Sequence, residues 1–191
     1  MTTEKRYEIL NSLPTYGPMY VPVTNNGEVF YSEGFPVRFY KTDGTEWVAN
    51  FQPGWTGLKQ IIEFENTPNL LVVACGTCYL MHPNDTKPIE VFGVSYSDIF
   101  KASKGRLVLQ DQIDLTIIEP DGTHWDTERI SWDGLAEIKV ENNLVYGLAF
   151  NPMHDADEWV EFKYDLDTKT LTGGSYHKYE IEKFKPWWKI W

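Results

Sequence analysis

Apolar and polar residues alternate along several segments of the chain, which is the pattern of β-strands with one buried face. The alternation is clearest in residues 144–150 and 160–166. Asp43-Gly44 and Asp121-Gly122 each separate two β-rich runs, and Asp-Gly provides the positive φ angles that a tight hairpin turn requires. The pattern therefore predicts an all-β protein built from antiparallel hairpins, with six or seven strands in each half.

Helical patterning is scarce by comparison. Residues 4–13 predict a short amphipathic helix that ends before Pro14, because proline cannot continue a helix. Residues 98–104 predict a second short helix. We therefore expect few helices, and none of them long.

Two segments of the chain, residues 27–96 and 105–176, repeat the same sequence pattern. Residues 27–47 align without a gap with residues 105–125, which brings Trp47 opposite Trp125. Further matches follow in order, and they are Trp55–Leu58 with Trp132–Leu135, Asn69–Ala74 with Asn143–Leu148, Asp85–Lys87 with Asp167–Lys169, and Gly93–Tyr96 with Gly173–Tyr176.

The repeat predicts a duplication within one domain, residues 1–191, that ends in an aromatic tail, residues 177–191. The expected architecture is an antiparallel meander of two pseudo-twofold repeats. Two packed sheets and a small propeller-like arrangement both fit this spacing of strands, and the sequence does not decide between them.

The chain is acidic, with 28 Asp and Glu against 17 Lys and Arg and a formal net charge of −11. This balance disfavours nucleic acid and anionic membranes as partners, because both are bound through clustered Lys and Arg. It suits a basic protein partner. The second repeat has fifteen acids and five bases, whereas the first has eight acids and four bases, so the excess negative charge lies in the second repeat.

The chain shows no secretion signal at its start and no apolar run of membrane-spanning length, and it has only two cysteines. These features predict a cytoplasmic protein.

Cys75 and Cys78 form the one pair with a redox or metal-binding spacing. They lie in strand-like sequence instead of at a helix start, where a redox pair has its thiol pKa lowered. A zinc site would need two further ligands. We expect a structural pair, with Cys75 buried among strand neighbours and neither thiol binding a metal.

No nucleophile, phosphate-binding or dinucleotide motif occurs, so we predict no catalytic residue, no cofactor and no metal site. The segment from His154 to Glu158 lacks the glycine and closing glutamate of a calcium-binding loop, and we interpret it as a solvated hairpin tip. Asp126, Glu128 and Asp133 could supply a carboxylate pair for glycoside hydrolysis, a weak signal in so acidic a chain.

The eight tryptophans divide into two groups. Four recur in both repeats, and we expect these to be core residues: Trp47, Trp55, Trp125 and Trp132. Four have no counterpart, and we expect them either to pack the tail against the body or to contact a partner, since Trp is enriched in interface hot spots: Trp159, Trp187, Trp188 and Trp191.

The segments from Asp43 to Trp55, from Arg129 to Leu135 and from Gly173 to Tyr176 resemble those of a group of small uncharacterised bacterial all-β proteins. That group has no established activity, so the resemblance implies a bacterial cytosolic origin and assigns no role to any residue.

Two classes of function follow from these observations. The first is a non-catalytic protein-binding domain, specifically an immunity-type protein that neutralises a bacterial toxin. Its partner-binding residues are expected among the exposed acids of the second repeat, Asp126, Glu128, Asp155, Asp157 and Glu158. The alternative is a hydrolase that acts on carbohydrate through Asp or Glu, and a purely structural or interaction role also stays open.

Overall fold

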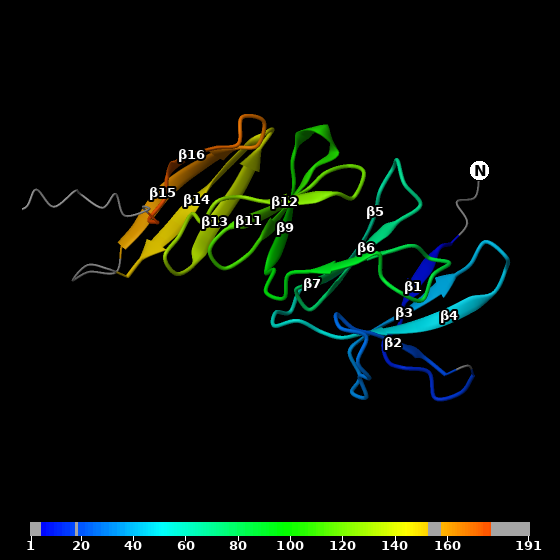
Figure 1. Cartoon of the computed structure of the whole chain (residues 1–191). Coiled ribbons are helices and arrows are strands. Elements are labelled where there is room, and N and C mark those ends of the chain that lie inside the picture. Colours follow the sequence, from blue (N-terminus) through cyan, green and yellow to red (C-terminus); the bar gives the residue numbers. More distant parts are fainter. Residues whose placement is uncertain (1–4, 18, 153–157, 177–191) are drawn as a thin grey trace, which may run out of the picture.

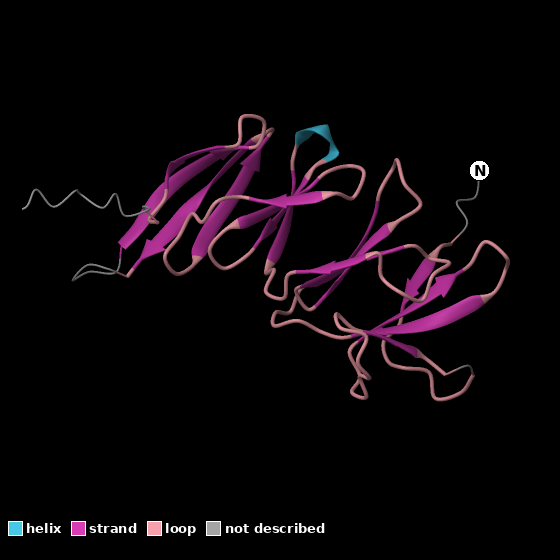
Figure 2. Ribbon diagram, viewed as in Figure 1, coloured by secondary structure: helices cyan, strands magenta, loops and turns pink. Residues whose placement is uncertain are grey.

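The computed structural model of the protein describes residues 5–17, 19–152 and 158–176. These residues form sixteen β-strands in four sheets of four strands each, and one short 3-10 turn at Ser103–Gly105 (Figure 2). The predicted all-β class is therefore confirmed. The described part of the chain contains no helix that is long and apolar enough to cross a membrane.

The first half of the chain forms two sheets. Sheet A has the strand order β1-β3-β4-β2, in which β2 and β4 run parallel and the other neighbours antiparallel. Its strands are β1 (Tyr7–Ile9), β2 (Val21–Val23), β3 (Phe35–Tyr40) and β4 (Glu46–Phe51). Sheet B is an antiparallel meander of β5 (Lys59–Glu63), β6 (Leu70–Ala74), β7 (Thr77–Met81) and β8 (Glu90–Phe92).

The second half also forms two sheets, both antiparallel meanders. Sheet C consists of β9 (Asp98–Lys101), β10 (Leu107–Gln110), β11 (Leu115–Ile118) and β12 (His124–Asp126). Sheet D consists of β13 (Leu135–Glu141), β14 (Leu144–Asn151), β15 (Glu158–Asp165) and β16 (Thr170–Gly173).

The four sheets stack in chain order, with an apolar core between each neighbouring pair. Sheets A and B enclose one core, sheets B and C a second, and sheets C and D a third. Figure 1 shows sheets A and D at opposite ends of the molecule. No core of the described residues joins these two end sheets, so the stack is open. Each repeat supplies strands to two packed sheets, while β1, β2 and β9 come from outside the repeats.

Sheet B is buried on both faces because it lies inside the stack. Leu70 and Val72 on β6 face the core shared with sheet A, whereas Leu71 and Val73 face the core shared with sheet C. All four are almost inaccessible to solvent. This explains why β6 is a continuous apolar run, while the strands of sheet D alternate.

The turns at Asp43-Gly44 and Asp121-Gly122 have the same hydrogen bonds. The carboxylate Oδ1 of Asp43 accepts from the amide and the hydroxyl of Thr45, at 2.9 and 2.6 Å, and Asp121 accepts from Thr123 at 3.0 and 2.6 Å. In both turns these bonds hold the pKa of the aspartate below its ordinary value. The glycine that follows has a φ of 82° in one turn and 89° in the other, a conformation that glycine adopts without strain.

The strand pairing next to these turns also agrees between the repeats. Trp47 lies opposite Phe39 on the β3–β4 hairpin, and Trp125 lies opposite Ile117 on the β11–β12 hairpin. In sequence, Phe39 and Ile117 are as far apart as the two tryptophans. The predicted match therefore holds for the two hairpins at the level of hydrogen-bonded partners. It is wrong for residues 27–34, which form no strand, whereas the matching residues 105–112 include β10, which pairs with β11; in the first repeat β1 takes this place beside β3.

Further along, the predicted match between Leu70 and Leu144 is wrong by one residue. Leu70 faces the core shared with the preceding sheet, whereas the residue of β14 that does so is Val145. With this correction Ala74 matches Ala149, and both are small, fully buried core residues. A one-residue slip moves every side chain of a strand to the opposite face, so the fold allows only the corrected match.

Both predicted helices are wrong. Tyr7–Ile9 is strand β1, which pairs antiparallel with β3, and Asp98–Lys101 is strand β9, which pairs with β10. Pairing with a neighbouring strand satisfies the backbone of both segments. For β1 the partner is distant in sequence, whereas β9 pairs with β10 across the short turn that follows it and turns Ile99 and Phe100 to two different cores.

Candidate functional site

The predicted partner-binding acids lie at the surface wherever the structure describes them. Asp126, Glu128 and Glu158 are exposed, as expected for carboxylates without a buried cationic partner. Asp155 and Asp157 lie outside the described residues, and so does most of the segment interpreted as a solvated hairpin tip.

Asp126 belongs to a group of three neighbouring carboxylates that the sequence did not indicate. Asp111, on the same loop between β10 and β11, and Asp126, at the end of β12, both act electrostatically on Asp114. Hydroxyl groups orient two of the three carboxylates. Ser95 donates to Asp111 and Thr116 donates to Asp126, each at 2.6 Å.

The protonation of Asp114 is strongly affected by this arrangement. Partial burial raises the pKa of Asp114 to about 6, and the negative charges of Asp111 and Asp126 act in the same direction, while Arg129 opposes them. At neutral pH the protein therefore holds three ionised carboxylates close together at a cost in stability.

The same end of the molecule continues into sheet D. The side chain of Gln112 donates to Asp133 at 3.2 Å, which joins the β10–β11 loop to the connection between sheets C and D. That connection is held to β14 through Ser131, whose hydroxyl donates to the Phe150 carbonyl at 3.1 Å, and Phe150 neighbours the start of β15 at Glu158. We give the name acidic edge to the acids that these connected segments carry: Asp111, Asp114, Asp126, Glu128, Asp133 and Glu158.

Arg129 is the cation nearest the acidic edge, and its guanidinium is engaged elsewhere. It donates to the backbone oxygens of Ser131 and Trp132, at 2.9 and 2.8 Å. It also lies over two aromatic rings, 4.6 Å from the centroid of Tyr176 and 5.2 Å from that of Trp132. The acidic edge therefore keeps its negative potential even though an arginine is close by.

The prediction that Cys75 is buried among strand neighbours is wrong. Cys75 has a φ of 51° and forms, with Gly76, the two-residue turn between β6 and β7, where it is only half-buried. Cys78 is fully buried in the core between sheets B and C, and burial raises the pKa of its thiol far above the ordinary range. The two thiols are free, and the described residues contain no group of three His, Cys, Asp or Glu that could hold a metal ion.

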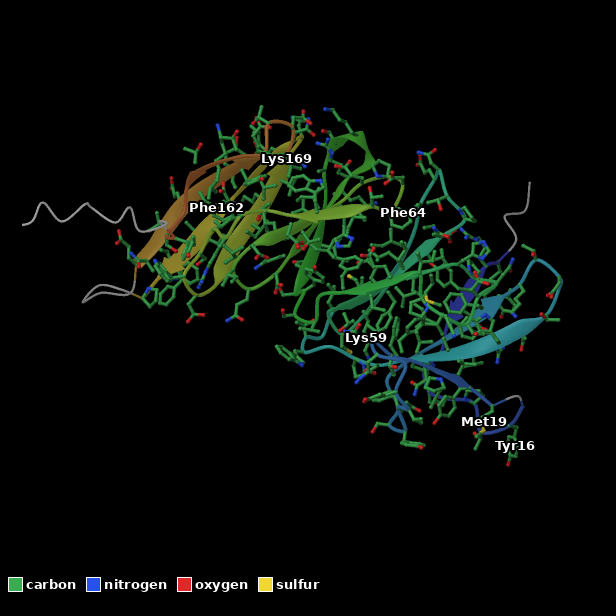
Figure 3. The ribbon with its side chains drawn as sticks, in the orientation of Figure 1. Tyr16, Met19, Lys59, Phe64, Phe162 and Lys169 are labelled. Atoms are coloured by element: carbon green, nitrogen blue, oxygen red, sulfur yellow. The ribbon has the colours of Figure 1, made fainter. Side chains whose placement is uncertain are left out.

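The sequence predicted that all four recurring tryptophans are core residues, and this is wrong for Trp55. Trp47 is buried, stacks on Phe39 and donates to the Pro83 carbonyl. Trp125 is half-buried against the core, with the ammonium of Lys169 at 4.0 Å from its ring centroid; Figure 3 labels Lys169 on the turn before β16. Trp55, however, is 82% exposed.

The exposure of Trp55 has a structural reason in the loop that carries it. Three consecutive amides donate to backbone carbonyls, Gly54 to Ala74, Trp55 to Val94 and Thr56 to Cys75, at distances of 2.8–2.9 Å. The loop is thus fixed through its backbone while the indole points to solvent. Recurrence of this tryptophan reflected a shared loop and not a shared core position.

Other large apolar side chains in the first half of the chain are also exposed, and the sequence did not single them out: Tyr16, Met19, Val29 and Tyr31. Tyr16 and Met19 lie on the loop before β2, at the edge of the molecule (Figure 3). Trp159 of sheet D, one of the four tryptophans without a counterpart, is 46% exposed. Trp187, Trp188 and Trp191 lie outside the described residues.

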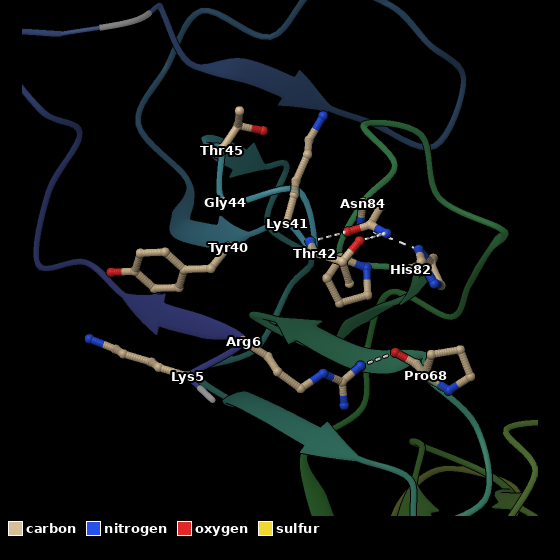
Figure 4. Close-up of a pocket in the computed structure, with 11 residues that line it drawn as sticks. Lys5, Arg6, Tyr40, Lys41, Thr42, Gly44, Thr45, Pro68, His82 and Asn84 are labelled. Carbon is tan, nitrogen blue, oxygen red and sulfur yellow. Dashed lines mark hydrogen bonds between the residues drawn. The ribbon is translucent and has the colours of Figure 1, made fainter. Parts of the chain in front are cut away.

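A pocket of about 600 Å³ opens between sheets A and B (Figure 4). Asn84 and Thr42 form its floor through two mutual hydrogen bonds, each of 3.0 Å, and Arg6 donates to the Pro68 carbonyl. None of the described residues that line this pocket is Asp or Glu. A glycoside hydrolase needs two carboxylates that flank the scissile bond, so this pocket does not fit that alternative.

Compared with known proteins, the chain matches no family model and no curated protein sequence. The resemblance to small uncharacterised bacterial proteins therefore stays a prediction.

Proposed function

We propose that the protein is a non-catalytic protein-binding domain of the immunity type, which neutralises a basic bacterial toxin in the cytoplasm by binding it at the acidic edge. The carboxylates of the edge face the partner, and its lysines and arginines pair with them. The remaining surface of the second repeat adds long-range attraction.

The observation that supports this proposal most directly is the crowding of Asp111, Asp114 and Asp126. Keeping three like charges together, one of them partly buried, destabilises the free protein, and such arrangements are found more often at functional sites than elsewhere. A cationic partner removes the repulsion. The repulsion that destabilises the free protein then favours formation of the complex.

The position of the charges supports the same proposal. Exposed acids at the rim of an interface speed the encounter with a basic partner and disfavour acidic ones, more than they add to the final affinity. The second repeat, which carries most of the excess negative charge, also carries the acidic edge. The first repeat lacks a comparable excess, although its turns and pairing match.

Co-expression with the product of the reading frame next to its own gene tests the proposal. We expect that product to inhibit growth when expressed alone, growth to recover when both proteins are made, and the two to co-purify as a complex. A harmless neighbour that does not bind, together with a carbohydrate hydrolase activity of the purified protein, would instead support the alternative.

A further inference from the structure

Sheet D ends the stack (Figure 1). On the face that it turns away from sheet C, strand β14 is apolar, whereas the neighbouring β15 carries Glu161 and Lys163 beside it. Tyr146, Leu148 and Phe150 on β14 and Trp159 on β15 occupy this outer face, as the pairing register shows. The three residues of β14 are half-buried, and none of the four belongs to a core. The rings of Phe150 and Trp159 pack together, with centroids 5.0 Å apart.

The division of residues between the two faces of β14 is the reverse of that expected for an end sheet. The inner face holds the small residues Val145, Gly147 and Ala149, and a Cβ at Gly147 would meet Ile138 and Phe162 at 2.7 Å. The larger residues point outward. A strand whose bulkier apolar side chains face away from its core has a second surface to bury.

The first repeat shows how such a face is covered. Sheet B turns Leu71 and Leu80 away from sheet A, and sheet C covers them. The chain reaches sheet C through Gly93–Tyr96, immediately before β9 (Asp98–Lys101), and Ile99 of β9 packs against this core. The segment that follows this tetrapeptide therefore covers the outer face of the sheet before it.

In the second repeat the matching tetrapeptide, Gly173–Tyr176, leads directly into residues 177–191. Its backbone is fixed next to sheet D, since the amides of Ser175 and Tyr176 both donate to the Ile130 carbonyl at 3.1 Å. From this anchor, we propose that residues 177–191 cover the outer face of sheet D within the same chain, as the segment after Tyr96 covers sheet B. The inference does not depend on the proposed toxin partner.

The composition of residues 177–191 suits this role. Seven of its residues are large and apolar: Tyr179, Ile181, Phe184, Trp187, Trp188, Ile190 and Trp191. They alternate with charged residues from Lys178 to Glu182, in the two-residue period of a strand with one apolar face. Four lysines against two glutamates also give the segment a positive charge, opposite in sign to the second repeat.

The length of the segment is sufficient. A sheet of four strands is roughly 15–20 Å wide, since neighbouring strands lie about 4.8 Å apart. The chain beyond Tyr176 would reach about 50 Å if fully extended. Residues 177–191 can therefore cross the face and still fold back over part of it.

Hydroxyl-radical footprinting of the whole protein, read by mass spectrometry, tests this inference. We expect Tyr146 and Trp159 to be labelled severalfold less in the full chain than in a chain ending at Tyr176, and we expect added peptide 177–191 to restore the protection. Trp55, exposed on the loop between sheets A and B, is the internal control and should be labelled equally in both.

If the shortened chain does not fold, the full chain with Trp187→Ser, Trp188→Ser and Trp191→Ser replaces it, and Tyr146 and Trp159 should again become more reactive. Equal labelling with and without these changes would overturn the proposal. Protection that appears only at concentrations where the protein dimerises would also overturn it, because a second copy would then occupy the face.

Discussion

Asp114 shows most clearly how a single residue connects the structure to the proposed function. Its carboxyl group is partly buried and has Asp111 and Asp126 as neighbours, so its pKa rises to about 6. Because the folded protein holds this proton more tightly than the unfolded chain, the folded state loses stability as the pH rises from about 4 through 6. Above that range the ionised group destabilises the fold.

Asp114→Asn should therefore stabilise the protein by about 1–2 kcal/mol at pH 7.5, a figure reduced from the full pKa shift because the group is partly exposed to solvent. The gain should disappear below pH 4, where the wild-type carboxyl is protonated. Urea unfolding at pH 4 and pH 7.5 measures both values, with the exposed Glu128→Gln as the control. A wild type more stable than Asp114→Asn at pH 7.5 would show that the carboxylate is paired with a cation instead.

At the scale of elements, the loop before β5 depends on a close approach of backbones. An added Cβ at Gly54 would lie 2.4 Å from the Val94 carbonyl oxygen and 2.7 Å from that of Cys75. Gly57, three residues later in the same loop, has open space around its Cα and no positive φ.

Gly54→Ala should lower the free energy of unfolding by about 2–3 kcal/mol, because backbone atoms of two other segments must move. Gly57→Ala should change it by less than about 0.5 kcal/mol, as surface substitutions usually do. Chemical denaturation of the two variants in parallel gives the comparison. A similar, small effect of both substitutions would mean that this loop is not fixed as described.

Structural elements that depend only on residues adjacent in sequence were predictable from the sequence. The turns at Asp43 and Asp121 form because a side chain bonds the residue two positions ahead, a signal that lies wholly within the turn. Strand β1 was not predictable, because its three residues become a strand only by pairing with β3. The exposure of Trp55 was missed for a similar reason, since the loop that carries it is fixed by β6 and by the chain after β8.

The candidate site was predictable in the same limited sense. Asp126, Glu128 and Glu158 were expected to be exposed because burying an unpaired charge has a high cost in free energy at any position of a chain. The contribution of Asp111 and Asp114 follows only from the position of the β10–β11 loop beside the end of β12. No residue pattern in the sequence predicts that this loop lies beside the end of β12.

At the scale of the whole molecule, the two repeats share structural features but differ in charge. The two repeats keep the same turns and the same hairpin pairing, and each supplies strands to two of the four stacked sheets. Their surfaces differ, since most of the excess acid belongs to the second repeat. We therefore assign binding of a basic partner to the acidic edge of the second repeat and predict that the surface of the first repeat contributes little.

The most direct test of this central claim is the rate at which the protein associates with the basic product of the neighbouring reading frame, measured at several salt concentrations. The edge variant carries Asp126→Asn, Glu128→Lys and Glu158→Lys, in which Asn keeps an acceptor for the Thr116 hydroxyl. The matched control carries Glu33→Gln, Glu28→Lys and Asp85→Lys in the first repeat, the same change in net charge, and leaves out Glu90 because its carboxylate lies 3.7 Å from His124 on β12.

The edge variant should associate about tenfold more slowly than the wild type and with a flatter salt dependence, because steering by charge is lost. The control should stay within about twofold of the wild type, since its charges lie on loops of the first repeat, and exposed charges separated by more than a Debye length of about 8 Å are largely screened from one another. Equal slowing by both variants would contradict the account, because it would mean that the acidic edge acts only through the net charge of the protein.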